Sequence, residues 1–161
     1  MKKYFLILLL FCLCISARAQ NISFFDLTNL TNLSDGEAHN YLTLGNIFKR
    51  DYIQELEGNK IEHFRTISSN VKEQTVTIGN NTRLANGNVL HNVTYTTTYA
   101  QHVVNMISQA KRTRMIMKFQ GTDANNNIYI FDSEFYRVAM YISTVNNTGS
   151  VEVHQKDFAG Y

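Results

Sequence analysis

The segment FYRVAMYIST, residues 135–144, alternates apolar and other side chains with a period of two. Because successive side chains of a strand point to opposite faces of a sheet, this period predicts a β-strand. We expect one face of this strand to form the core, with Tyr136, Val138, Met140 and Ile142. The other face carries Phe135, Arg137, Ala139 and Tyr141.

The flanking segments show the same alternation and extend this second face. Isoleucines at 128 and 130 alternate with aromatics, and valines at 151 and 153 alternate with polar residues. If these strands are neighbours, their second face forms a partner-binding surface of Tyr129, Phe131, Arg137, Tyr141 and His154. Tyrosine and arginine are enriched at binding hot spots. The alternative is that a helix from the other half of the chain covers these aromatics.

Further strands follow from the same period and from the turn residues between them. The turns Glu57-Gly58-Asn59-Lys60 and Asn86-Gly87 are typical of hairpins. The expected strands are Ile47–Leu56, Ile61–Ser68, Val71–Ile78, Val89–Thr98, Met115–Gln120, Asn127–Phe131, Phe135–Thr144 and Ser150–Gln155.

Three helices are expected from capping residues and helical spacing. A short helix follows Ser23, and a second begins at Ser34, where Glu37 completes a capping box. Gly45 is expected to end this second helix in the left-handed conformation. Residues 99–111 form the third, and the basic run 111–114 complements its negative end or contacts an anion.

This order of elements predicts a single α+β domain over residues 20–161. We expect two α-β-β-β units that form an antiparallel sheet with the helices packed on one face. In its element order the chain resembles the tandem α-β repeat proteins of the β-lactamase-inhibitor-protein-like group. That resemblance implies a secreted bacterial protein with a tandem α-β repeat fold. It does not imply a function, because proteins of one fold differ in function.

The N-terminal residues have the layout of a secretory signal peptide. Two lysines precede an apolar run from Tyr4 to Ile15, and Ala17-Arg18-Ala19 gives an A-x-A cleavage site. The run is short for a bilayer span. We therefore predict an exported bacterial protein, periplasmic or extracellular, without a membrane span.

Cleavage after residue 19 changes the charge and the cysteine content. The formal charge falls from +2 to −1, so charge gives no argument for nucleic acid or an anionic membrane. Both cysteines, Cys12 and Cys14, are removed, which excludes disulfides and cysteine-bound zinc. Phe11 and Leu13 precede them, and a lipid-anchor site needs a small residue there.

Metal and cofactor motifs are not found in the sequence. No two of the five histidines are spaced as paired ligands on a helix: His39, His63, His91, His102 and His154. The positions Asp123, Asn125, Asn127 and Glu134 approach a calcium loop, but Ile128 stands where glycine is needed. We interpret this segment as a hairpin turn and expect neither metal nor cofactor.

The sequence favours non-catalytic binding of a protein or a cell-envelope component through a sheet face. The alternative is a small cofactor-free hydrolase or lyase with a site of dispersed histidines and carboxylates. A buried His–carboxylate contact inside a deep pocket would favour the enzyme, and a shallow aromatic face would favour binding.

The A-x-A site predicts where the exported chain begins. Because alanines occupy both recognition positions of the cleavage site, the exported protein should begin at Gln20. Mass spectrometry of the exported protein should find this N-terminus. A diacylglyceryl group on Cys12 or Cys14 would contradict the prediction.

Overall fold

The computed structural model describes residues 22–67 and 73–157. The predicted signal peptide and the predicted strand ends at Ser68 and Val71 lie outside these residues. The described helices are α2 (Phe24–Leu30), α3 (Asp35–Leu44) and α4 (Gln101–Arg112). The described residues also form a large antiparallel sheet, which confirms the predicted α+β class.

The large sheet has eight strands in the order β1-β2-β3-β6-β10-β9-β8-β7. These strands are β1 (Phe48–Leu56), β2 (Asn59–Thr66), β3 (Gln74–Ile78), β6 (Asn92–Thr97), β7 (Ile116–Thr122), β8 (Asn126–Asp132), β9 (Tyr136–Ser143) and β10 (Gly149–Gln155). A small separate hairpin, β4 (Thr82–Arg83) and β5 (Val89–Leu90), is inserted between β3 and β6. The predicted strand from Val89 to Thr98 is therefore interrupted at His91.

Each half of the chain contributes four neighbouring strands to this sheet, rather than the three of the predicted units. The last strands of the two halves, β6 and β10, pair with each other in the middle. Their register aligns Val153 with Val93 and Val151 with Tyr95. All four side chains are buried, so the junction between the halves is also the centre of the core.

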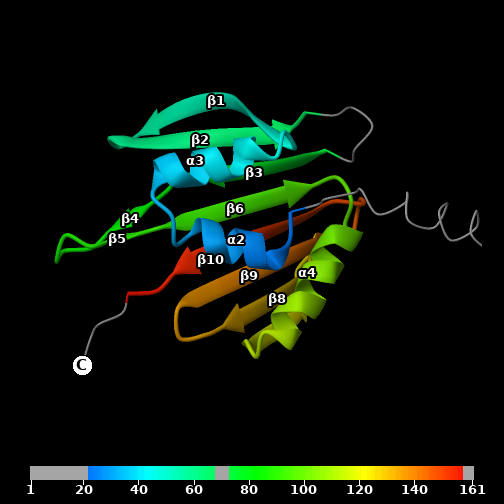
Figure 1. The fold of residues 1–161 in the computed structure, drawn as a ribbon. Helices are drawn as coiled ribbons and strands as arrows, with labels where there is room; N and C mark the ends of the chain where they lie inside the picture. The colour runs from blue at the N-terminus through cyan, green and yellow to red at the C-terminus, as the bar shows by residue number, and fades with distance from the viewer. Residues whose placement is uncertain (1–21, 68–72, 158–161) are drawn as a thin grey trace, which may run out of the picture.

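All three helices pack on the same face of the sheet, as predicted (Figure 1). Their buried residues share one core with alternate residues of the strands, because the other side chains of each strand point away. The core includes Phe24, Leu27, Leu30, Ala38, Leu42, Val103, Met106, Phe64, Val76, Tyr95, Phe131, Val138, Met140, Val151 and Val153.

Capping interactions define the helix starts. The Glu37 carboxylate accepts hydrogen bonds from the backbone N and the hydroxyl of Ser34, at 3.0 and 2.7 Å, which confirms the predicted capping box. The predicted left-handed end at Gly45 is wrong, because its φ is −80°. Asn46 has the left-handed φ instead, at 51°, and asparagine tolerates that conformation.

Gly79, just after β3, is required by both its backbone and its surroundings. Its φ is +89°, and a Cβ atom there would lie 2.1 Å from the carbonyl oxygen of Lys60. Gly87 has a similar φ of +90°, but nothing lies within 4 Å of the corresponding Cβ position. A side chain at either glycine would strain the backbone, but only a side chain at Gly79 would also clash with neighbouring atoms.

We expect Gly79→Ala to lower the free energy of unfolding by more than about 2 kcal/mol, because the new methyl group displaces backbone atoms. Gly87→Ala is the matched control and should cost about 1 kcal/mol, from the positive φ alone. Urea unfolding of both variants measures the difference. Equal losses of unfolding free energy in the two variants would contradict this, because they would show that β2 moves away from residue 79 without an energetic cost.

Candidate functional site: the open face of the sheet

The face of the eight-stranded sheet opposite the helices is the candidate site, and we call it the open face. The strand register places one row of side chains across the whole of this face, one from each strand. Starting from β7, the row is Phe119, Ile130, Ala139, Glu152, Thr94, Thr77, His63 and Tyr52.

The open face has an apolar half and a hydroxyl-rich half. The apolar half, on β7, β8 and β9, consists of Ile116, Phe119, Ile128, Ile130, Ala139 and Tyr141. Ile116 and Phe119 are 60 % and 48 % exposed, and the other four are half-buried. The hydroxyl-rich half is formed by Thr75, Thr77, Thr94 and Thr96 on β3 and β6.

The structure places three of the five predicted binding residues on the open face. Tyr141, Arg137 and His154 lie on the open face, and the register pairs Arg137 with His154. Tyr129 and Phe131 lie on the helix face, opposite Met140 and Val138, so their predicted position on the second face was wrong. Phe131 is fully buried, since the larger aromatic rings fill the core and the isoleucines between them take the open face.

A cavity of about 370 Å³ lies at one end of the open face, between the two halves. Thr75, Thr96, Tyr141 and Ser150 line its sheet side. The hydroxyl oxygens of Thr75 and Thr96 are 2.6 Å apart. Burial, helped by the charges of Glu152 and Asp123, raises the pKa of Tyr141, so its hydroxyl remains a hydrogen-bond donor at neutral pH.

His63, on β2, lies beside the hydroxyl-rich half, between Tyr52 and Thr77. The ring of Tyr52 stacks on it with centroids 4.1 Å apart, and Thr77 lies 3.1 Å from its Nδ1 atom. Burial lowers the pKa of His63, against a smaller effect of Asp51. The Nε2 atom of this neutral imidazole is buried, so His63 contributes packing against Tyr52 rather than an accessible ring nitrogen.

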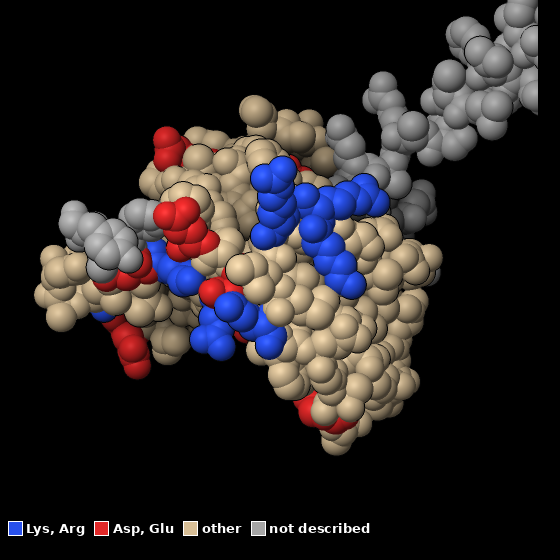
Figure 2. Space-filling model, turned by 90° about the horizontal axis from the view of Figure 1, so that it is seen from below, with Lys and Arg blue, Asp and Glu red and all other residues tan. Residues whose placement is uncertain are grey.

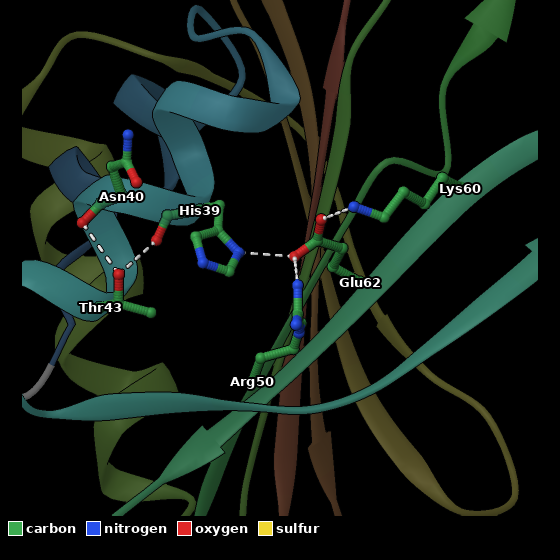
Figure 3. Close-up of polar contacts among 6 residues, drawn as sticks. All are labelled: His39, Asn40, Thr43, Arg50, Lys60 and Glu62. Carbon is green, nitrogen blue, oxygen red and sulfur yellow. Dashed lines mark hydrogen bonds and ion pairs between the residues drawn. The ribbon is translucent and has the colours of Figure 1, made fainter.

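A second polar cluster lies on the helix face and joins α3 to the first two strands (Figure 3). Glu62 is 4 % exposed, and its carboxylate lies 2.6 Å from His39 Nδ1, 2.5 Å from Lys60 Nζ and 3.7 Å from Arg50 Nη1. Burial opposes its ionisation, but the hydrogen bonds from Lys60 and His39 outweigh it and lower the pKa of Glu62.

This cluster connects α3 to the sheet through the Glu62 carboxylate. Both oxygens of Glu62 are occupied by basic groups, and neither Glu62 nor His39 lines any of the three cavities described for the molecule. The buried His–carboxylate contact that would favour an enzyme is therefore present, but it lies outside these three cavities.

The segment that approaches a calcium loop is the turn between β7 and β8. Asp123 Oδ1 accepts hydrogen bonds from the backbone N of Asn125 and Asn126, at 2.7 and 2.6 Å. Asn127 already belongs to β8, where it pairs with Ile142. Within residues 22–67 and 73–157, no group of three or more histidine, cysteine or acidic side chains is arranged to hold a metal ion.

Sequence reasoning missed the threonine rows and the exposed β7 residues. The threonines alternate with the buried residues Val76, Val93 and Tyr95, so the period that predicted the strands also contained this signal. The exposed residues of β7 could not be predicted from alternation, because a bulge between Met117 and Phe119 shifts which side chains face the core.

No protein-family model matches this chain, and comparisons with curated proteins and with solved structures find no significant match. The resemblance to the β-lactamase-inhibitor-protein-like group stays a prediction. None of the helices in the described part of the chain is both long and apolar enough to cross a membrane.

We expect Glu62→Gln to lower the free energy of unfolding by about 1–3 kcal/mol at neutral pH, because it removes a charged hydrogen-bond acceptor. The folded-state pKa of Glu62 lies below its ordinary value of 4.5. Its contribution is therefore complete above that pH and is lost as the pH falls through the lower folded-state value.

Urea unfolding across the acidic range measures this effect, and the variant should show a shallower loss of stability than the wild type. Glu152→Gln is the control, since Glu152 is partly exposed on the open face, and it should change stability by less than about 0.5 kcal/mol. Identical pH profiles for wild type and Glu62→Gln would contradict the assignment.

Proposed function

We propose that this protein is an exported, non-catalytic binding protein of the bacterial cell envelope. Its partner, a protein or an envelope component, binds the open face of the sheet. The observation that carries the proposal is the one-sided packing. The three described helices bury one face of the sheet and leave apolar side chains of the other face accessible.

The apolar half of the open face supplies the area for binding. Phe119, Ile130 and Ala139 form one row of register partners, and Ile128 and Tyr141 are partners in the next row, so these five residues form one continuous patch. Ile116 lies at its margin, opposite Asp132. Contiguous exposed apolar surface is typical of interaction sites, and burying it against a partner is favourable by about 25 cal/mol per Å².

Tyr141 is the central residue of the proposed surface. It lies beside Ile128 on one side and Ser150 on the other, where the apolar half meets the hydroxyl-rich half. Its ring offers apolar area, and its hydroxyl offers a hydrogen bond at the wall of the cavity. Rigid aromatic side chains of this kind are frequent hot spots.

The titratable groups of the open face support binding over catalysis. His154 Nε2 lies 3.6 Å from the Glu152 carboxylate, but both side chains are well exposed and neither lines the cavity. No observation specifically favours the hydrolase or lyase alternative. The proposal of export rests on the sequence of residues 1–19.

Two neighbouring residues of β9 test the proposal before a partner is known. Tyr141→Ala should cost about 0.5 kcal/mol of stability, because its side chain lies on the open face. Met140→Ala should cost about 2–5 kcal/mol, because it leaves a cavity in the core. Urea midpoints compare the two, and equal losses would show that the protein itself needs the open-face tyrosine.

A second experiment measures binding to the partner recovered from envelope extracts. Tyr141→Ala should weaken its binding by more than about 1 kcal/mol. Leu44→Ala, which truncates an exposed apolar side chain at the end of α3, should leave binding unchanged. Equal effects of the two substitutions would contradict the proposed surface.

A further inference from the structure

The two edge strands of the sheet carry different charge patterns. On β1, Arg50 lies near Glu62 and Asp51 pairs with Arg65 at 2.9 Å, so this edge is internally balanced. Residues 111–122, which end α4 and form β7, contain four cations and no acid. The edge of β7 is therefore unbalanced.

The four cations, Lys111, Arg112, Arg114 and Lys118, are all exposed, and none forms an ion pair with a residue that the structure describes. Figure 2 shows Lys and Arg side chains gathered on the side of the molecule seen from below. In Figure 1, α4 ends on that side. We call these four residues the basic edge.

The helix dipole accounts for only part of the basic edge. Lys111 and Arg112 lie in the last turn of α4, where positive charge is favourable. Arg114 and Lys118 lie beyond the helix, and Lys118 falls in the bulge of β7, without a register partner on β8. These two charges have no role in the contacts that the described residues form.

The backbone of β7 is free on its outer side, since β7 ends the strand order and no described strand pairs with it there. Such an edge is a template for another strand. Two exposed apolar side chains, Ile116 and Phe119, project from the same strand toward the open face. Hydrogen-bonding groups, apolar contacts and positive charge are thus combined on one short segment.

We propose that β7 binds an acidic, extended segment of a partner protein, which adds as a ninth strand to the sheet. Backbone hydrogen bonds would give affinity, and carboxylates facing the basic edge would select the partner. The same charges repel a second copy of β7, so they exclude self-association while they admit an acidic strand.

This edge adjoins the open face, but strand addition there does not require the open face to be occupied. An anionic membrane is the competing occupant, because it also attracts clustered cations beside apolar side chains. The unpaired backbone distinguishes the two, since a strand uses its hydrogen-bonding groups and a lipid surface does not.

The test uses a labelled peptide in which glutamate alternates with valine, and fluorescence anisotropy with the mature protein. The peptide should bind, and binding should weaken as salt is added. The variant Arg114→Asn/Lys118→Gln should lower its affinity at least about tenfold. Asparagine suits position 114, where φ is +64°. Thermal unfolding checks that the variant is folded.

Three controls make the result specific. Lys49→Gln removes an exposed cation from the β1 edge and should change affinity less than about twofold. Tyr141→Ala should bind the peptide like the wild type, which separates this proposal from the function of the open face. A peptide with methylated backbone nitrogens on alternate residues keeps its charge but should not bind, because it cannot pair with a strand.

The proposal is overturned if the alternating peptide does not bind, if the methylated peptide binds equally well, or if the double variant retains wild-type affinity. It is also overturned if vesicles containing phosphatidylglycerol bind the protein and the peptide does not compete. If the double variant fails to fold, Lys118→Gln alone must reduce the affinity, or the basic edge is not the site.

Discussion

The antiparallel pairing of β6 with β10 joins the two halves of the chain into one sheet. From Gly149 opposite Thr97 to His154 opposite Asn92, this pair aligns the buried side chains of both halves on one face. The helices can then share a single core with both half-sheets. The opposite face becomes continuous across eight strands for the same reason, so the candidate site is a direct result of this pairing.

A buried polar group is satisfied at this junction. The hydroxyl of Tyr95 in β6 donates to Gln74 Oε1 at 3.1 Å, and His102 Nδ1 of α4 lies 3.1 Å from the same hydroxyl. Burial raises the pKa of Tyr95 and lowers that of His102, so both groups stay neutral. Because an unsatisfied buried hydroxyl is costly, these contacts specify how α4 begins above the central strands.

Short-range sequence patterns predicted where helices and strands occur. They were less successful at predicting which face of a strand points to the core. The capping box at Ser34 and the outward position of Tyr141 follow from short-range spacing and are present. The faces of β8 were reversed, because Ile128 and Tyr129 are both suitable core residues and only the pairing with β9 decides between them. Glu62 was also missed as a buried residue, since its burial depends on His39, which lies 23 positions away in the sequence.

The strand order also constrains when the protein can fold. β10 is the last strand of the sheet in sequence, yet it lies at the centre between β6 and β9. The half-sheets cannot join until residues 149–155 have been synthesised. More than fifty residues separate β6 from β10, the strand that joins it to the second half-sheet. Such non-local pairing slows folding. For a chain that carries a signal peptide, as predicted here, slow closure of the sheet lengthens the time in which the chain remains unfolded and competent for translocation.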